Sequence, residues 1–456
     1  MRAAALVVLV GLGLLAAAPS SSAGDGKGPA AAPAASAPLT EKELAKVEGW
    51  IRDLEHHEYL RRTAATEALR GFGVRGLPLL REAAASRSEE TRARARLLVT
   101  VMEAGLGVVD ESGDDWLTLK GDMGRTSARG EPPASAGPQV RMTRSIGAAL
   151  ADGSTPPDAP IAAAEGALVV AAGDRITAFG SADLSHRWTV GLGAQVIASP
   201  VVSRGRVFVG TSRGLTALDL RTSREVWTVD AAYGVGAAPL VSGDTLYACI
   251  GDEALVALDP STGEKRWEFR CPAGSSSPVV AGGRVVVGTK GAEVVALDAA
   301  TGKPAWRLPV DGMVSFAPAV VGDSVIVGDG GRRLRCVDAE TGLVLWTKSV
   351  RGRFAGDGPA VGRSAIVVAL DSMEVEAFDP STGARLWSRW MGTLHLSSPA
   401  LAGGLVIFGS RSTLVAIHAA TGDDAWDLDL EGRVSCPVVA DRTVFVLAGK
   451  RILSIR

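Results

Sequence analysis

Hydrophobic and polar positions follow two different periods along the chain. From Leu39 to about Gly107, apolar residues recur every three or four positions, as one buried face of a helix requires. Thr40 and Glu43 form a capping box ahead of the first helix, and further helices are expected at about 58–72, 74–86 and 88–105. After residue 138 the pattern changes to short, consecutive apolar runs separated by Gly-containing turns, which is typical of strands buried on both faces. The pattern therefore predicts a small helical region followed by a long β region.

Tryptophans divide the β region into equal units. Seven of them lie 39 to 41 residues apart: Trp188, Trp227, Trp267, Trp306, Trp346, Trp387 and Trp426. Each unit contains four apolar segments, and the period equals the length of one four-stranded propeller blade. The repeat predicts a β-propeller.

A turn motif precedes each tryptophan. Its form is Ala-x-Asp-x-x-Thr-Gly-x-x-x-Trp, complete at Ala257–Trp267, Ala296–Trp306 and Ala377–Trp387. Other copies carry single substitutions, namely Ser223 for Gly, Cys336 for Ala and His418 for Asp, and the copy at Ala178–Trp188 is degenerate. Asp is expected to accept hydrogen bonds from the turn, Gly to supply positive φ, and Ala to leave room for an indole. We therefore interpret Cys336 and His418 as structural substitutions and not as a nucleophile and a base.

An eighth unit is split between the two ends of the region. It begins at Cys436, ends with Arg451 to Ile455, and has no Trp strand. The segment from Gln139 to Ile146 can supply that strand, with Met142 where Trp would stand. Closing the ring in this way removes exposed sheet edges. The prediction is an all-β eight-bladed propeller of four-stranded blades closed by an N-terminal strand, with seven blades as the alternative.

The N-terminus carries a predicted export signal. Arg2, an apolar run and the small residues Ser21, Ser22 and Ala23 are typical of a cleaved signal peptide. The alternative, a membrane anchor, would need roughly twenty apolar residues, and the run has about sixteen. The predicted organisation is then a signal peptide (1–23), a disordered linker (24–38), a helical domain (39–107), an extended lead-in (108–137) and the propeller (138–456). We expect an extracytoplasmic protein, periplasmic or secreted, without a transmembrane anchor.

Charge and cysteine content narrow the partners. The formal net charge is −2, so no overall positive field would attract nucleic acid, and none is expected as a partner. The four cysteines, Cys249, Cys271, Cys336 and Cys436, allow several disulfide pairings and form no CxxC or Cys/His cluster. No metal ligand is predicted.

The helical region resembles a pair of HEAT-type repeats in the segments Tyr59–Leu69, Leu77–Arg81 and Glu90–Leu98. Such helices commonly offer a protein-binding face, and a docking or spacer role is equally open. Arg92, Arg94 and Arg96 alternate along the last helix and are expected to be solvated.

The β repeat resembles the pyrroloquinoline-quinone (PQQ) propeller repeat over residues 138–456, and Trp116 to Thr126 resembles the lead-in often found ahead of such propellers. That family includes quinoprotein dehydrogenases and non-catalytic members such as the propeller lipoprotein of the outer-membrane β-barrel assembly machinery. The adjacent cysteines typical of the enzymes are absent here, and so is the lipid-bearing cysteine of the lipoprotein. No catalytic residue and no cofactor are therefore expected, and PQQ and calcium enter only if the chain is an enzyme.

The variable loops supply a candidate binding face. In a four-stranded blade, the loops before the first strand and between the second and third strands share one face of the ring. Candidate residues on that face are Arg332, Arg333, Arg351, Arg353, Tyr233, Phe316, His395 and Arg411. A guanidinium cluster suits carboxylate or phosphate recognition, although solvated arginines would give the same pattern. The hypothesis is a non-catalytic scaffold that binds a protein or peptide in the cell envelope. The alternatives are a PQQ-dependent dehydrogenase and a ring that only presents the helical domain.

Overall fold

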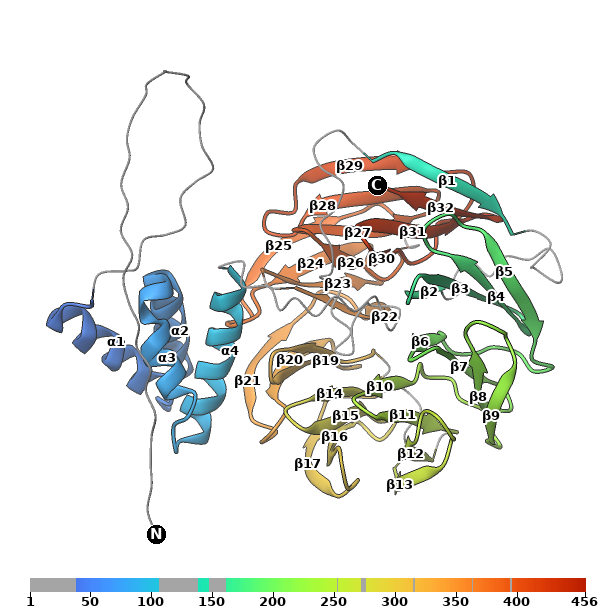
Figure 1. Ribbon diagram of the computed structural model, residues 1–456. Coiled ribbons are helices and arrows are strands. Elements are labelled where there is room, and N and C mark those ends of the chain that lie inside the picture. Colours follow the sequence, from blue (N-terminus) through green and yellow to red (C-terminus); the bar gives the residue numbers. More distant parts are fainter. Residues whose placement is uncertain are drawn as a thin grey trace, which may run out of the picture.

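The computed structural model describes residues 38–105, 138–146, 161–251, 253–271, 276–314, 316–362, 364–393 and 396–456. The predicted signal peptide, nearly all of the predicted linker and the lead-in segment 108–137 lie outside these residues. What is described forms a helical part beside a ring of sheets (Figure 1).

The helical part contains α1 (Glu41–Asp53), α2 (Tyr59–Phe72), the 3-10 helix η1 (Gly73–Gly76), α3 (Leu77–Ala83) and α4 (Glu89–Gly105). The capping box is confirmed, since Thr40 and the Glu43 carboxylate exchange hydrogen bonds at the start of α1. Val47, Leu69, Leu80 and Leu98 are among the residues of its small buried core. The expected helices are therefore present.

The ring contains eight four-stranded antiparallel sheets. Blade 1 is β2 (Ile161–Ala164), β3 (Ala167–Ala172), β4 (Arg175–Gly180) and β5 (His186–Gly191), and blade 2 is β6 (Val201–Ser203), β7 (Arg206–Thr211), β8 (Gly214–Asp219) and β9 (Glu225–Asp230). Blade 3 is β10 (Leu240–Ser242), β11 (Thr245–Ile250), β12 (Ala254–Leu258) and β13 (Lys265–Arg270), and blade 4 is β14 (Val279–Ala281), β15 (Arg284–Gly288), β16 (Glu293–Asp298) and β17 (Pro304–Pro309).

Blade 5 is β18 (Ala319–Val321), β19 (Ser324–Gly328), β20 (Arg333–Asp338) and β21 (Val344–Ser349), and blade 6 is β22 (Phe354–Val361), β23 (Ile366–Leu370), β24 (Glu374–Phe378) and β25 (Arg385–Trp390). Blade 7 is β26 (Ala400–Ala402), β27 (Leu405–Ser410), β28 (Thr413–His418) and β29 (Asp424–Asp429), and blade 8 is β30 (Val438–Ala440), β31 (Thr443–Ala448), β32 (Arg451–Ile455) and β1 (Val140–Ser145). Eight blades are confirmed, and the alternative of seven is wrong.

The N-terminal strand closes the ring. β1 pairs antiparallel with β32, and Met142 lies opposite Ser454, just as Trp267 lies opposite Ala257 in blade 3. In both blades the strand register shifts next to this pair. The first strand of blade 1 also contacts the first strand of blade 8 (Figure 1). Met142 therefore takes the place of the missing tryptophan, as the repeat predicts.

Indoles join each blade to the next. The Nε1–H group donates to a backbone carbonyl of the following blade in six pairs: Trp188 to Leu220, Trp227 to Pro260, Trp267 to Ala299, Trp306 to Ala339, Trp346 to Pro380 and Trp387 to Ala419. These acceptors lie in the turn between the third and fourth strands. Blade 8 has no such turn because its fourth strand is β1, from the N-terminal side of the ring. Among the residues that the structure describes, the Nε1 atom of Trp426 has no hydrogen-bond partner.

The turn motif shapes the surface that receives each indole. Gly302 has φ +70°, and a Cβ atom placed on it would lie 2.5 Å from the ring of Trp267. In the same turn, the Asp298 carboxylate accepts from the Thr301 hydroxyl at 2.8 Å and from the Thr301 backbone at 2.9 Å. These bonds hold the pKa of Asp298 below its usual value. The roles expected of Asp and Gly are both observed.

The two unusual residues in the motif occupy structural positions. Cys336 is fully buried opposite Trp346, and burial raises the pKa of its thiol to about 12. Such a thiol stays protonated and does not act as a nucleophile near neutral pH. His418 ends β28 at the turn, where its carbonyl accepts from the Gly422 N–H.

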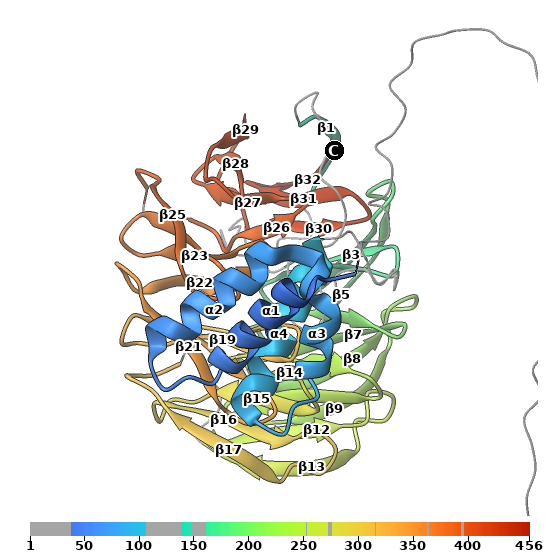
Figure 2. The same cartoon turned by 90° about the vertical axis from the view of Figure 1, so that its left-hand side faces the viewer.

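The helical part docks on blades 5 and 6. In Figure 1, α4 is the helix nearest the ring, and Figure 2 shows the helices from outside, in front of the blades. The buried Arg94 donates to the Leu345 carbonyl at 3.0 Å, and Arg96 pairs with Glu340 at 2.6 Å. The expectation that these arginines are solvated is therefore wrong. The helix side that meets the ring is the apolar stripe of Ala93, Leu97 and Val101, and the two arginines lie on either side of it.

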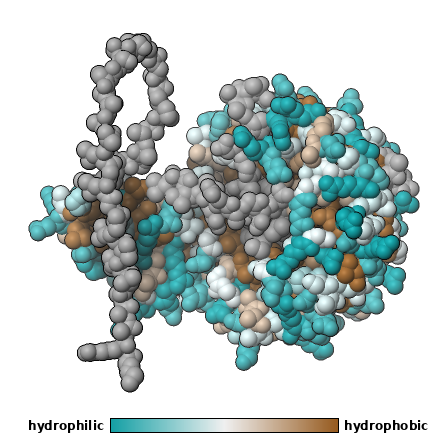
Figure 3. Space-filling view, in the orientation of Figure 1, coloured by the Kyte–Doolittle hydropathy of each residue, from teal (hydrophilic) through white to brown (hydrophobic). Residues whose placement is uncertain are grey.

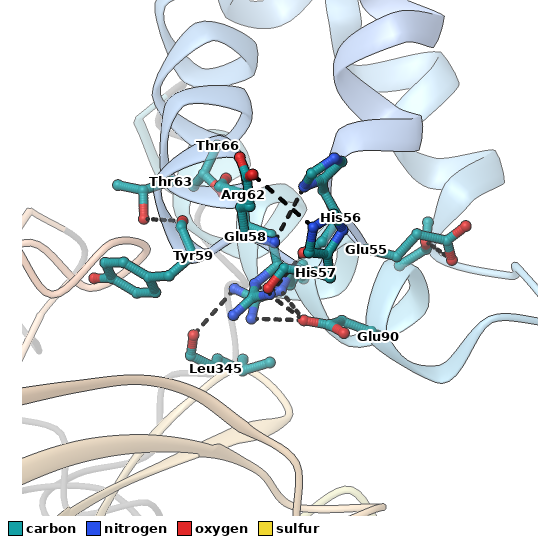
Figure 4. A network of polar contacts seen from close by, with 12 residues as sticks. Glu55, His56, His57, Glu58, Tyr59, Arg62, Thr63, Thr66, Glu90 and Leu345 are labelled. Carbon is teal, nitrogen blue, oxygen red and sulfur yellow. Dashed lines mark hydrogen bonds and ion pairs between the residues drawn. The ribbon is translucent and has the colours of Figure 1, made fainter.

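Further contacts extend this interface. Lys348 Nζ lies 2.9 Å from the Tyr59 hydroxyl, and Arg70 forms an ion pair with Asp379 in a tight turn of blade 6. Figure 4 shows how the segment between α1 and α2, the start of α4 and Leu345 meet at its edge. The docking uses tight turns and the outer strand of blade 5, so it leaves the loops between the second and third strands uncovered.

Two opposite substitutions, one that removes a glycine from the turn motif and one that introduces it, test the role of this residue in stability. Gly302→Ala should lower the free energy of unfolding by about 2 kcal/mol, since Cβ meets the indole at a positive φ. Ser223→Gly, at the equivalent turn with φ +60°, should raise it by up to about 1 kcal/mol. Urea unfolding followed by circular dichroism measures both. Equal effects of the two changes would contradict this account of the turn.

The docking of the helices depends on the buried guanidinium of Arg94. Arg94→Met should destabilise the protein by about 2 kcal/mol, because the Leu345 carbonyl and the Glu90 carboxylate lose a charged donor. Hydrogen exchange along α4 should also rise. Arg87→Met changes an exposed arginine of the same domain and serves as the control. Unchanged exchange in α4 would show that docking does not depend on this contact.

Candidate functional site

Two sets of loops share one face of the ring, which we call the loop face. It is formed by the connections between blades and by the turns between second and third strands. Backbone hydrogen bonds join the two sets, as where Val350 N–H donates to the Arg332 carbonyl at 3.0 Å and Val434 N–H donates to the Arg411 carbonyl at 2.8 Å. Adjacent loops therefore support one another.

A buried ion network lies beneath the loop face in blade 5. Arg335, inside β20, forms ion pairs with Asp329 and with Asp311, and the Asp329 side chain is fully buried. Asp329 also accepts the Arg333 N–H at 3.1 Å. The corresponding positions of blades 3 and 4 hold Val256 and Val295. The network thus ties the loop entering blade 5 to the loop between its second and third strands.

Blade 6 has a buried carboxylate at the same register. Glu376 has a side chain with no exposed surface, and Arg385 Nη2 lies 3.2 Å from its Oε1 atom. Within the described ranges neither carboxylate oxygen has a hydrogen-bond partner, so the arginine compensates the charge only in part. Burial raises the pKa of Glu376, and the neighbouring arginines oppose that rise. Sequence reasoning missed both Arg335 and Glu376, although a charged residue inside an apolar strand was the available signal.

The four predicted arginines come from two adjoining loops, and the structure divides them into two pairs. Arg333 forms an ion pair with Asp311 at 3.2 Å, and Arg351 forms one with Glu374 at 3.1 Å. The guanidinium groups of Arg332 and Arg353 are exposed and make no ion pair within the described part of the chain. Only these two remain available for an outside carboxylate.

Large apolar side chains are exposed on the same face. Tyr233 is 71% exposed, Trp390 is 67% exposed and Met313 is 48% exposed. Tyr233 and Met313 lie in connections between blades, and Trp390 ends β25 where such a connection begins. In the view of Figure 3, the ring surface is mostly hydrophilic, and apolar residues appear in separate patches. Apolar and aromatic side chains beside arginine are typical of protein-binding surfaces.

The remaining predicted residues have different positions. Arg411 is exposed, and its Nε atom donates to the Thr393 hydroxyl at 3.3 Å. Phe316 is only 3% exposed and stacks on Phe354 with ring centroids 4.7 Å apart, so it supports the loops from below and does not belong to the exposed surface. His395 lies outside the described residues.

Comparison with known families gives one match. A family model described as outer membrane protein assembly factor BamB matches residues 140–276, 271–393 and 371–455. Together these matches run from the N-terminal strand to the last strand of the ring. No curated protein is significantly similar in sequence.

Solved structures share the fold at low sequence identity. The crystal structure of BamB from Moraxella catarrhalis has a TM-score of 0.60 and 19% identity, covering 70% of this chain and 98% of that one. Quinohemoprotein alcohol dehydrogenase from Comamonas testosteroni has a TM-score of 0.62 and 14% identity, covering 82% and 83%. The computationally designed Ika8 protein has a TM-score of 0.59 and 17% identity, covering 65% and 96%. These likenesses establish the fold and do not distinguish a binding protein from an enzyme.

No helix in the described ranges has the length and apolar character needed to cross a bilayer. Within the same ranges, no three His, Cys, Asp or Glu side chains are grouped so as to hold a metal ion.

The buried carboxylate of blade 6 predicts a pH-dependent stability. Burial raises the folded-state pKa of Glu376, so the folded protein holds that proton more tightly than the unfolded chain. Its contribution to stability is therefore present at acid pH and is lost as pH rises through the raised pKa. Glu376→Gln should melt at a higher temperature than the parent at pH 8, with a difference that shrinks toward pH 4.

Glu374→Gln is the matched control for this experiment, because Glu374 pairs with the exposed Arg351. It loses this ion pair but also removes the repulsion that Glu374 exerts on Glu376, so any gain at pH 8 should be smaller than that from Glu376→Gln. A gain from Glu374→Gln equal to that from Glu376→Gln would show that burial is not the cause.

Proposed function

This chain belongs to the family described as outer membrane protein assembly factor BamB, and from that premise we propose that it is a non-catalytic, extracytoplasmic scaffold that binds a protein or peptide partner in the cell envelope. Binding takes place on the loop face. The observation that carries the proposal is the combination there of exposed apolar side chains with guanidinium groups that have no carboxylate partner in the described residues.

The position of the helical part supports the same assignment. α2 and α4 contact blades 5 and 6 through tight turns and the outer strand, which leaves the loop face of these blades open to a partner. A ring that only presented the helices would not need ordered loops with exposed Tyr233 and Trp390. We therefore assign partner binding to the ring and give the helices a supporting role.

A quinone-dependent dehydrogenase is the second candidate, favoured by the likeness of the fold to quinohemoprotein alcohol dehydrogenase. The residues do not fit its cofactors. The described residues offer no cluster of carboxylates for calcium, and Cys336, the cysteine inside the blade 5 motif, is buried with a raised pKa. We derive no redox step for this chain.

Site-specific photocrosslinking in envelope preparations tests the proposal. A benzophenone amino acid placed at Tyr233, Met313 or Trp390 should crosslink to the same protein, since all three side chains are exposed on the loop face. Placed at Val226, which is exposed on an outer strand, it should not. Mass spectrometry identifies the product. Equal crosslinking from Val226, or no product from the three loop positions, would contradict binding through this face, and turnover with added quinone and calcium would favour the dehydrogenase.

A further inference from the structure

We propose, on the basis of the function proposed above, that the outer rim of blades 5 and 6 binds an acidic segment of the partner that carries at least one large apolar side chain. We define the blade 5–6 rim by four residues, Met313, Arg332, Arg353 and Trp390. The inference rests on how they are connected, on their charge and on their exposure.

A continuous series of contacts links the four residues. The Met313 carbonyl accepts from Gly330 N–H at 3.1 Å, two residues before Arg332. The Arg332 carbonyl in turn accepts from Val350 N–H, at the start of the loop that contains Arg353. Strands β24 and β25 of blade 6 then connect this loop to Trp390. Glu374 in β24 forms an ion pair with Arg351 of the loop and lies opposite Trp390 in β25. The rim is therefore one surface that spans two blades.

The rim carries positive charge that the nearby carboxylates do not compensate. Nearby carboxylates already have partners within the protein: Asp311 and Asp329 pair with Arg335, Glu374 pairs with Arg351, and Asp371 accepts the backbone N–H of Arg353. Arg332 and Arg353 keep exposed guanidinium groups with no carboxylate among the described residues. A partner that supplies carboxylates at this place gains two charge-assisted contacts without breaking existing ones.

The backbone that carries the cationic side chains is fixed before binding. Arg332 has φ +60°, and its backbone is fixed by hydrogen bonds to Asp329 and Val350 on either side. Below it, the buried Arg335 network ties the two loops together, and the helical part braces the same two blades from their tight turns. A rigid site loses less conformational entropy on binding than a mobile one.

Apolar surface completes the rim and favours a protein segment over a lipid surface. Trp390 and Met313 flank the arginines at opposite ends and are largely exposed. Trp, Arg and Met are enriched where proteins bind one another, and planar guanidinium groups match carboxylates in a forked geometry. Two basic residues would give only weak attraction to an anionic membrane. The chemistry therefore fits an acidic segment with an apolar anchor.

Fluorescence anisotropy with designed peptides and the full chain tests the proposal. The probe is a fluorescein-labelled decapeptide of Asp and Glu around a central Leu-Phe pair. One comparison peptide replaces the acidic residues by Lys, and another replaces Leu-Phe by Ala-Ala. The acidic peptide with Leu-Phe should bind most tightly, and raising the salt concentration should weaken its binding.

Substitutions then locate the binding. The double variant Arg332→Gln and Arg353→Gln should weaken binding about fivefold or more, because two exposed ion pairs are lost. Trp390→Ala should weaken it by a similar factor. The matched control is the double variant Arg204→Gln and Arg213→Gln, which removes two exposed arginines of blade 2, one of them also at positive φ. This control should bind like the parent, and melting temperatures show whether each variant is folded.

Three results would overturn the inference. They are equal losses in the control, unchanged binding in the rim variants, and preferential binding of the Lys peptide. Binding of anionic phosphatidylglycerol vesicles that the rim variants abolish, without peptide binding, would assign the rim to lipid instead. If loop-face crosslinking succeeds while the rim variants have no effect, the proposed function stands and this inference fails. If crosslinking also fails, both fail.

Discussion

The ring depends on one repeated interaction, the contact of an indole with the turn of the following blade. Each of the six contacts has a hydrogen bond from Nε1 to a backbone carbonyl, and the turn that receives the indole has a residue at positive φ, which is a glycine in five turns and Ser223 in the sixth. Glycine suits this position because it adopts positive φ without strain and because, at the five glycine turns, a Cβ atom would lie within 3 Å of the indole. Since the motif sets the turn and the tryptophan sets the seam, neighbouring blades meet in the same way around the ring.

Uniform seams leave the other side of each blade free to vary. Trp426 illustrates the constraint by its exception, because blade 8 is completed by a strand from the far end of the chain and lacks the turn that would accept its N–H. The loops on the opposite face do not form these indole contacts between blades. Their residues can therefore provide recognition, and the exposed arginines and aromatic side chains lie there.

Blades 5 and 6 differ from the others on both faces. Their strands contain Arg335 and Glu376, where neighbouring blades have aliphatic residues, and their tight turns receive the helices. Burial of these charges lowers stability unless each is compensated, as it is for Arg335 and only partly for Glu376. The same pair of blades thus combines an internal brace, a docked domain and the exposed cations of the rim.

The ring could be predicted from the amino-acid pattern, because the tryptophan period and the turn motif are local features repeated at fixed spacing. The pattern also identified Met142 as the residue that completes blade 8, since only one segment had the right place and character. The sequence could not decide which charged side chains are free. Arg94 and Arg96 have the alternation of solvated residues, yet they meet Leu345 and Glu340, more than two hundred positions away.

The same limit applies to the loop face. Arg332 and Arg333 are adjacent arginines, and the folded loops determine that Arg333 pairs with Asp311 while Arg332 has no ion pair among the described residues. Phe316 is an aromatic loop residue like Tyr233, but it faces Phe354 and is buried. A repeat fixes the backbone because its interactions are the same in every copy. Which side chains are available to a partner depends instead on contacts between loops that differ in each blade, and these arise only when the ring closes.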